Sequence, residues 1–237
     1  MVKAISFDVG ETLLRPFPGF GELAARCCAI EGEILGPDAS AELERFADTF
    51  FSDLRIRGET YSRSEEESRR IWTSLYRQFL ESQEIRPANV ARLADQLYLT
   101  FTDTASYRLF DDARPVLAEF RRRGFRIGII SNWEAWLSRL LVETGLDGFV
   151  HFQAISGVVG FEKPHRQIFE SAIRDASLPA WAILHVGDSL ISDVHGAQQV
   201  GMQAVLLDRH GRQRGSAVAR VETLHELLAM PELERPT

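Results

Sequence analysis

The stretch that decides the fold is Ile5-Ser6-Phe7-Asp8-Val9-Gly10-Glu11-Thr12-Leu13. The apolar residues before Asp8 predict a short buried strand, which delivers this carboxylate to the carboxyl end of the strand. Gly10 then permits a sharp turn, and Thr12 offers a hydroxyl group. Ligands of open α/β sheets bind just beyond the carboxyl ends of the strands, so Asp8 is a candidate catalytic residue. Because Asp and Gly are also common turn residues, this stretch alone leaves both interpretations open.

Composition and charge restrict the class of protein. The chain has 237 residues, of which 45% are hydrophobic and 26% charged, as in ordinary globular proteins. Its net charge of −7 argues against a nucleic-acid or acidic-membrane surface, but not against a small anionic substrate. We find neither an apolar run near the ~18 residues that span a bilayer nor a signal-peptide pattern. Cys27 and Cys28 are neighbours on an expected helix and point apart, which argues against a disulfide. We therefore expect a cytoplasmic protein, whose oligomeric state the sequence does not indicate.

The region after Leu14 changes character. A Pro- and Gly-rich linker or hinge is predicted at 15–21, and helical patterns follow it. Four amphipathic helices are expected, at 22–33, at 39–57, from Ser64 onward and after Pro87. Four such helices in succession predict a small bundle.

From Asp111 onward, short apolar strands alternate with helices. Strands are expected at 126–131, 150–155, 182–186 and 204–207, and helices at 112–123, 135–144, 164–176, 192–200 and 221–230. This alternation predicts a doubly wound parallel sheet, to which the strand before Asp8 also belongs. The predicted fold is therefore an α/β core of residues 1–15 and 110–237, with an all-helical insert at 16–109.

Three later loops leave apolar strands with side chains suited to chemistry. Ser131 and Asn132 follow one strand, Lys163 follows a second, and Asp188 and Asp193 follow a third. Each has an ordinary explanation, since Ser-Asn and Asp often cap helices and most lysines are solvated. The alternative is an anion site formed by the hydroxyl, amide and ammonium groups, next to carboxylates that would hold Mg²⁺.

Taken together and in this order, these residues resemble the motifs of the haloacid dehalogenase-like (HAD) superfamily. Asp8 with Thr12 resembles the first motif, Ser131 the second, and Lys163 the third. The run from Gly187-Asp188 to Asp193 resembles the fourth. The helical insert directly after the first motif is similar to the C1-type cap of subfamily I. The resemblance covers essentially the whole chain and implies a Rossmann-like core.

The resemblance also implies a mechanism and a metal. The family attacks its substrate with the aspartate of the first motif, here Asp8, and water then hydrolyses the covalent aspartyl intermediate. Mg²⁺ would bridge Asp8, the carbonyl group of Gly10, Asp188 and the transferring phosphoryl group. Asp193 would lie in or near the coordination shell. The metal would let two anions approach each other.

The remaining motif residues would bind the phosphoryl group. By resemblance, Ser131 with the following Asn132, and Lys163, would balance charge on the phosphoryl oxygens, and Thr12 completes the first motif. The implied partner is a small phosphorylated metabolite, with no nucleic acid and no membrane. The physiological substrate cannot be predicted, because cap side chains follow no motif.

One departure from the family pattern concerns residue 10. Phosphatases of this family place a second aspartate two residues after the nucleophile, where it protonates the leaving group, but this chain has Gly10. Such an acid–base group typically contributes ~10²–10⁴-fold to the rate. Glu11 is the alternative acid, although a shift of one residue usually redirects a side chain. Acyl and aryl phosphates, whose leaving groups are good, need an acid least.

Three functions remain open at this stage. The first is a Mg²⁺-dependent phosphatase that works through Asp8 with weakened acid–base help. The second is a metal-independent 2-haloacid dehalogenase, which also needs no second aspartate but does not explain the metal-type carboxylate Asp188. The third is a catalytically impaired metal-binding interaction protein. We predict the first, a hydrolase of phosphoric monoesters or acyl phosphates.

Overall fold

The computed structural model describes residues 1–215 and 217–234. The chain divides into two compact units, which are described separately. The α/β unit consists of Met1–Arg15 and Leu109–Thr237, and the helical unit of Pro16–Arg108.

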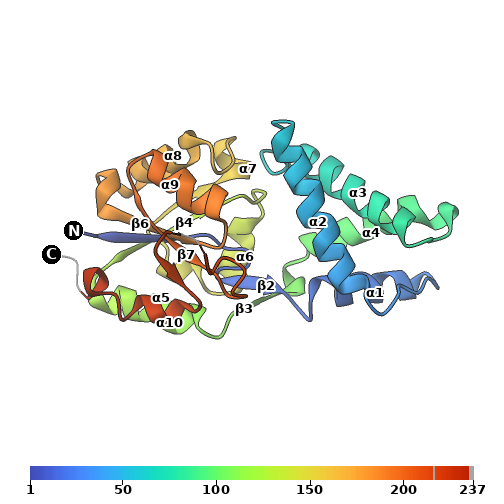
Figure 1. Cartoon of the computed structure of the whole chain (residues 1–237), viewed down its shortest axis with the longest axis horizontal. Helices are drawn as coiled ribbons and strands as arrows, with labels where there is room; N and C mark the ends of the chain where they lie inside the picture. Colours follow the sequence, from blue (N-terminus) through green and yellow to red (C-terminus); the bar gives the residue numbers. More distant parts are fainter. Residues whose placement is uncertain (216, 235–237) are drawn as a thin grey trace. The chain divides into compact units, whose positions relative to one another are not determined.

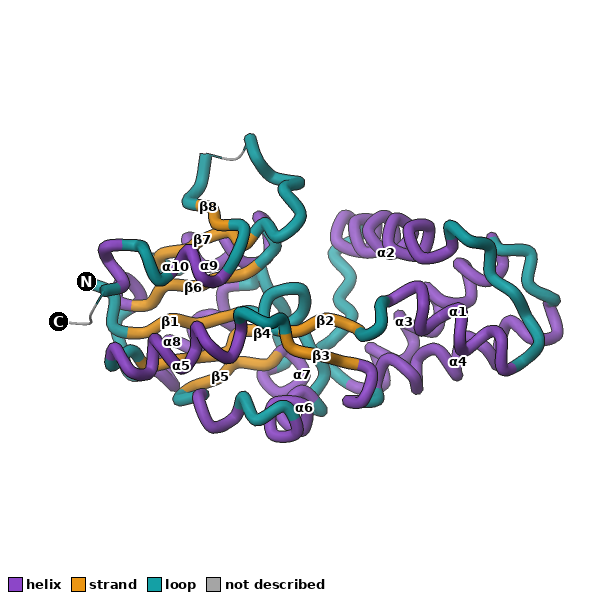
Figure 2. Tube along the Cα trace, turned by 90° about the horizontal axis from the view of Figure 1, so that it is seen from below, coloured by secondary structure: helices purple, strands orange, loops and turns teal. Residues whose placement is uncertain are grey.

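A six-stranded sheet forms the centre of the α/β unit, with the order β5-β4-β1-β6-β7-β8 (Figure 2). The strands are β1 (Ala4–Phe7), β4 (Arg126–Ser131), β5 (Phe152–Ile155), β6 (Ile183–Gly187), β7 (Gln203–Leu207) and β8 (Arg220–Val221). Every neighbouring pair is parallel, and β1 lies between β4 and β6, with Phe7 opposite Ile129 and Val186. The predicted doubly wound α/β fold is therefore confirmed.

Helices cover both faces of this sheet. They are α5 (Ala113–Arg123), α6 (Leu137–Glu143), α7 (Ser156–Val159), α8 (Arg166–Ala176), α9 (Gly196–Gln199) and α10 (Leu224–Leu227). Figure 1 shows α8 and α9 on one side of the sheet and α5 and α10 on the other. The apolar face of α8 packs on β4 and β5 through Ile168, Phe169 and Ala172. The strands are buried on both faces, as parallel sheets require.

Several expected helix boundaries differ from those in the structure. The helix expected at 135–144 spans Leu137–Glu143, and the one expected at 221–230 is limited to Leu224–Leu227. The helix expected from Pro164 begins at Arg166, because His165 caps it and accepts a hydrogen bond from the Gln167 amide at 3.3 Å. The expected regular helix at 192–200 is a π-helical turn over Leu190–His195, followed by the short α9. Side-chain bonds to the backbone explain this turn and are described with the site below.

Three short strands were not predicted. Strands β2 (Leu14–Pro16) and β3 (Tyr107–Leu109) form a two-stranded ribbon. The first overlaps the predicted hinge, and the second lies at the end of the predicted helical insert. Strand β8 adds an edge to the main sheet and includes Val221, which was expected to begin a helix. Strands of two or three residues carry too few alternating positions to give a periodic signal.

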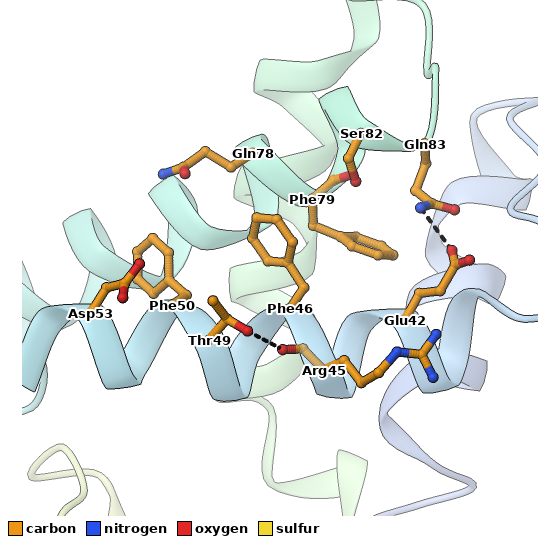
Figure 3. A pocket seen from close by; sticks show the side chains of 10 residues that line it. All are labelled: Glu42, Arg45, Phe46, Thr49, Phe50, Asp53, Gln78, Phe79, Ser82 and Gln83. Atoms are coloured by element: carbon orange, nitrogen blue, oxygen red, sulfur yellow. Dashed lines mark hydrogen bonds between the residues drawn. The ribbon is translucent and has the colours of Figure 1, made fainter.

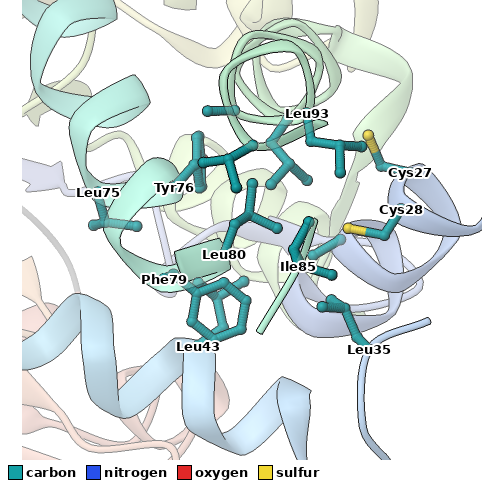
Figure 4. Packing of buried hydrophobic residues seen from close by; sticks show 14 of the residues in the cluster. Cys27, Cys28, Leu35, Leu43, Leu75, Tyr76, Phe79, Leu80, Ile85 and Leu93 are labelled. Atoms are coloured by element: carbon teal, nitrogen blue, oxygen red, sulfur yellow. The ribbon is translucent and has the colours of Figure 1, made fainter. Parts of the chain in front are cut away.

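The helical unit contains four long helices, α1 (Phe20–Ile30), α2 (Ala39–Ile56), α3 (Glu65–Ser82) and α4 (Pro87–Thr102). Ser64 caps α3 as its sequence predicted, and accepts a hydrogen bond from the Glu67 amide at 3.2 Å. Figure 4 shows the apolar core between the helices. Its buried residues include Cys27, Cys28, Leu43, Leu75, Tyr76, Phe79, Leu80 and Leu93.

Both cysteines are free. The pKa of Cys28 is raised to about 12, first by burial and then by the charge of the neighbouring Cys27. The thiols therefore pack as small apolar groups.

A hollow of about 500 Å³ lies between α2 and α3, lined in part by Phe46, Phe50 and Phe79 (Figure 3). It contains no predicted site residue. Among the described residues, we find no helix that combines the length and the apolar character needed to cross a membrane.

Candidate active site

The carboxyl ends of β1, β4 and β6 bring the predicted site residues to one edge of the sheet. Asp8 directly follows β1, Ser131 ends β4, and Asp188 directly follows β6. Because the three strands are parallel neighbours, residues far apart in sequence meet there. Asp8 therefore lies at the carboxyl edge of the sheet, as its sequence predicted.

Three carboxylates form a cluster at this edge. Oxygen atoms of Asp8, Asp188 and Asp193 lie within 4.8 Å of one another, with Asp8 and Asp193 buried and Asp188 exposed. The pKa of Asp188 is raised well above its ordinary value, first because surrounding atoms displace water and then because Asp193 and Asp8 repel its charge. A divalent cation would remove this repulsion, and an all-oxygen donor set is the kind that Mg²⁺ prefers. The residues present therefore fit a Mg²⁺ ion.

Lys163 joins two of these carboxylates. Its Nζ donates hydrogen bonds to Asp8 Oδ1 at 2.7 Å and to Asp193 Oδ1 at 2.5 Å, and its side chain is only 3% exposed. Burial lowers the pKa of Lys163, but the charges of Asp193 and Asp8 outweigh this and raise it. The ordinary explanation, a solvated lysine, is thus wrong for this residue. The side chain is a fixed positive charge at the site.

The pKa values of the two buried aspartates shift in opposite directions because their partners differ. Burial raises the pKa of Asp8, against the opposing effects of Lys163 and of a hydrogen bond from Ser131. Burial also acts on Asp193, but Lys163 and His185 outweigh it and hold the pKa of that carboxyl well below its usual range. Asp193 is therefore the firmly ionised partner of Lys163.

The loop after β6 is shaped around Asp193. The Ser189 amide donates to Asp193 Oδ2 at 2.9 Å, and the Ser192 amide donates to Ser189 Oγ at 3.1 Å. These bonds draw the chain into the π-helical turn. A Cβ at Gly187 would lie 2.2 Å from Asp193 Cγ, so glycine is required there for the carboxylate to approach.

Ser131 and Asn132 take different roles. Ser131 is buried, and its hydroxyl acts to lower the pKa of Asp8. The Asn132 amide binds the backbone of Lys163 on both sides: Oδ1 accepts from Lys163 N at 2.6 Å and Nδ2 donates to Lys163 O at 3.0 Å. The structure therefore places the Asn132 side chain on the Lys163 backbone, where it fixes the position of the lysine.

The loop after Asp8 holds Gly10, Glu11 and Thr12. The Thr12 hydroxyl is buried and has no hydrogen-bond partner among the described residues, which leaves it available to a ligand. Its carbonyl oxygen accepts a bond from Arg209 Nη2 at 2.8 Å. Glu11 has a left-handed backbone (φ 52°), and its carboxylate lies 3.9 Å from His210 Nε2.

Two groups at the site were missed from the sequence. His185 lies within strand β6, with Nε2 3.0 Å from Asp193 Oδ1 and Nδ1 3.0 Å from Ser6 Oγ. Arg209 binds both Asp112 oxygens, at 3.0 and 2.8 Å, in addition to the Thr12 carbonyl. The only sequence signal for these two residues was that each is a polar residue within or shortly after an apolar strand. Their partners are set by strand order, which the sequence did not state.

The comparison with known protein families agrees with this geometry. The family model for haloacid dehalogenase-like hydrolases matches residues 2–201. The chain belongs to this family. A human relative, haloacid dehalogenase-like hydrolase domain-containing protein 3, is 30% identical over 208 residues, which cover 87% of this chain and 82% of that protein. The family membership predicted from the motifs is thus confirmed.

Two further HAD relatives bear on chemistry and fold. A phosphoserine phosphatase of Thermus thermophilus is 29% identical over 225 residues, covering 88% of this chain and 89% of that protein. The structure of the HAD-hydrolase YfnB from Bacillus subtilis, bound to magnesium, aligns with a TM-score of 0.79 and 20% identity, covering 96% of this chain and 97% of that one. At this identity the second likeness shows the fold alone.

Proposed function

We propose that this HAD-like hydrolase is a Mg²⁺-dependent phosphatase that acts on a small phosphorylated substrate through an aspartyl-phosphate at Asp8. The observation that carries the proposal is the buried Lys163, fixed between Asp8 and Asp193 within the carboxylate cluster. The site thus combines a nucleophile, a place for a divalent cation and a fixed positive charge, which are the parts that phosphoryl transfer requires. The likeness to a phosphatase over most of the chain supports the same reaction.

Asp8 would attack the phosphorus atom, and water would then hydrolyse the aspartyl-phosphate. Asp8, Asp188 and the Gly10 carbonyl group would hold Mg²⁺, whose charge lets the anionic nucleophile and substrate approach each other. Both oxygens of Asp193 already accept hydrogen bonds within the protein. We therefore assign Asp193 mainly to holding Lys163, at the border of the metal site.

The phosphoryl oxygens would be bound by three groups of this edge. Lys163 supplies charge, Ser131 supplies a hydroxyl next to Asp8, and the unpartnered Thr12 hydroxyl supplies a further donor. Donors held in place before the reaction stabilise developing charge without the cost of reorganisation. Asn132 would act through Lys163 as a positioning residue.

We propose that the partners are confined to this small substrate and Mg²⁺, since the net charge of −7 does not favour nucleic acid. The free thiols of Cys27 and Cys28 support a reducing compartment, and we propose the cytoplasm.

Hydrolysis of an aryl phosphate and of acetyl phosphate, each with Mg²⁺ and with EDTA, tests the proposal. We expect turnover that requires Mg²⁺ and disappears in Asp8→Asn, while Asp48→Asn, a change at an exposed aspartate of α2, keeps full activity. Phosphate release that continues in EDTA or in Asp8→Asn would overturn the proposal. Metal-free turnover of a 2-haloacid would favour the dehalogenase instead, and no turnover of either substrate class would favour a binding protein.

A further inference from the structure

Trp133 is held firmly beside the loop that follows Asp8. Its amide donates to Ser156 Oγ at 2.9 Å, and its carbonyl oxygen accepts bonds from Ser156 Oγ at 3.0 Å and from the Gly157 amide at 2.9 Å. Ser156 is fully buried, so these bonds are shielded from water. The ring of Trp136 stands nearly perpendicular to that of Trp133, with 5.4 Å between centroids. The backbone of Trp133 is therefore anchored by the fold, and its indole packs against Trp136.

The indole of Trp133 lies where a side chain at residue 10 would begin. A Cβ placed on Gly10 would be 3.3 Å from Trp133 Cζ3. The φ angle of Gly10 lies outside the left-handed region, so its backbone conformation does not require glycine. What glycine provides is the space into which the ring fits. Trp133, in the loop after β4, thus presents an aromatic surface where a polar side chain at residue 10 would otherwise project.

This aromatic surface adjoins a set of charged and hydroxyl groups. Lys163, Ser131 and the carboxylate cluster surround Asp8 and suit a phosphoryl group. The indole suits the part of the substrate that is not phosphoryl, namely the leaving group. Glu11, the nearest carboxylic acid in sequence, extends to within 3.9 Å of His210.

We propose that Trp133 is a specificity-determining residue that binds a flat leaving group, and that the enzyme hydrolyses phosphoryl compounds whose leaving group departs as a stable anion, such as aryl and acyl phosphates. The inference rests on the proposed function. In the first step an oxygen of Asp8 bonds to phosphorus, the bond from phosphorus to the leaving oxygen breaks, and its electron pair leaves with that oxygen. No proton is supplied from residue 10.

The missing side chain at residue 10 also affects the second step. Water bonds to the phosphorus of the aspartyl-phosphate, the bond to Asp8 breaks, and inorganic phosphate leaves with one proton released to solvent. Because residue 10 has no side chain to take that proton, this step is slow compared with the first. The aspartyl-phosphate therefore accumulates with good leaving groups.

A series of substituted phenyl phosphates and alkyl phosphates tests both steps with the unmodified protein and Mg²⁺. We expect kcat/KM to fall by about 10²–10⁴-fold from the most acidic phenol to an alkyl alcohol. We also expect a burst of phenol equal to the enzyme concentration, with the mass of one phosphoryl group added to Asp8. Equal kcat/KM for alkyl and aryl phosphates, or the absence of a burst, would overturn the inference. Failure of the proposed function is distinct, since it appears as turnover without Mg²⁺ or in Asp8→Asn.

Variants at residue 10 distinguish the effect of an added acid from the effect of added side-chain volume. Gly10→Asp is expected to raise kcat/KM for alkyl phosphates by about 10²-fold or more and to abolish the burst. Gly10→Ala meets the same Trp133 atom without adding an acid, and is expected to do neither. A gain with Gly10→Ala equal to that with Gly10→Asp would overturn the argument.

The role of the indole is tested by binding, without turnover. Phenylphosphonate and methylphosphonate are titrated calorimetrically into the Asp8→Asn protein with Mg²⁺. Trp133→Leu is expected to lower the affinity for phenylphosphonate by about 2- to 12-fold and leave that for methylphosphonate unchanged. Trp181→Leu, a change at a tryptophan that is 56% exposed, is the matched control and should alter neither. Equal losses for both ligands in Trp133→Leu would contradict a leaving-group role.

Discussion

The candidate active-site edge of the α/β unit and the core of the helical unit bury opposite kinds of side chain. At the edge, Asp8, Lys163, Asp193 and His185 are all at most 8% exposed. The core between α1 and α4 buries aliphatic and aromatic side chains and two thiols. A buried charge is costly unless it is paired, whereas buried apolar groups stabilise in proportion to the area removed from water. Burial at the edge is therefore costly in free energy unless its charges are paired, whereas burial in the helical core stabilises the folded state.

The largest expected effect breaks the charged edge. Lys163→Met leaves the carboxylates of Asp8 and Asp193 buried without their shared cation. We expect a loss of about 10²–10³-fold in kcat. Without Mg²⁺ we also expect a loss of about 3–5 kcal/mol in the free energy of unfolding. Turnover assays and urea titrations measure these two quantities.

Lys3→Met supplies the control for this prediction, because Lys3 is exposed and is the only other lysine of the sequence. It should leave both quantities unchanged. Retention of full turnover in Lys163→Met would show that the buried ion pair is structural only.

A smaller effect is expected in the apolar core. Leu93 on α4 is fully buried, and Leu93→Ala should lower the free energy of unfolding by about 2–5 kcal/mol, because it removes apolar contacts and leaves a cavity. Leu99→Ala, on the same helix but 51% exposed, should change it by less than about 0.5 kcal/mol. Urea titrations of both variants compare the sites. Equal losses would show that burial does not set stability in this unit.

The smallest of the three effects is expected at the buried ion pair of Asp112 and Arg209 in the α/β unit. Burial acts to raise the pKa of Asp112, but hydrogen bonds from Arg209 and the Leu224 amide outweigh it and lower the pKa. Because the folded pKa is depressed, this stabilisation is present above the ordinary value of 3.8 and disappears as the pH falls through the folded value. Asp112→Asn should therefore cost about 1.5–3 kcal/mol at pH 7 and progressively less below pH ~4.

The measurement is the free energy of unfolding as a function of pH. Asp111→Asn is the control, since Asp111 is exposed and adjacent in sequence. A difference between Asp112→Asn and the unmodified protein that stays constant down to acidic pH would contradict the ionised pair.

The sequence by itself determined most of the order of elements and the position of the candidate site residues at strand ends. Apolar strands that end at Asp8, Ser131 and Asp188 implied one edge of a parallel sheet, because strand periodicity and the position of ligands in such sheets are local rules. The helical insert was likewise predicted from the spacing of its apolar residues. Short strands and the turn over Leu190–His195 were not, since they depend on a few hydrogen bonds and not on periodicity.

Only the tertiary structure decided which groups touch. The contact of Lys163 with Asp8 joins residues 155 positions apart, and the approach of Trp133 to Gly10 joins loops that follow two different strands. The pairing of Asn132 with the Lys163 backbone changed the interpretation of Asn132, and the contact of His185 with Asp193 was not anticipated. Such contacts follow from strand order and close packing, which act on the whole chain at once, whereas a motif records only the residues at one strand end.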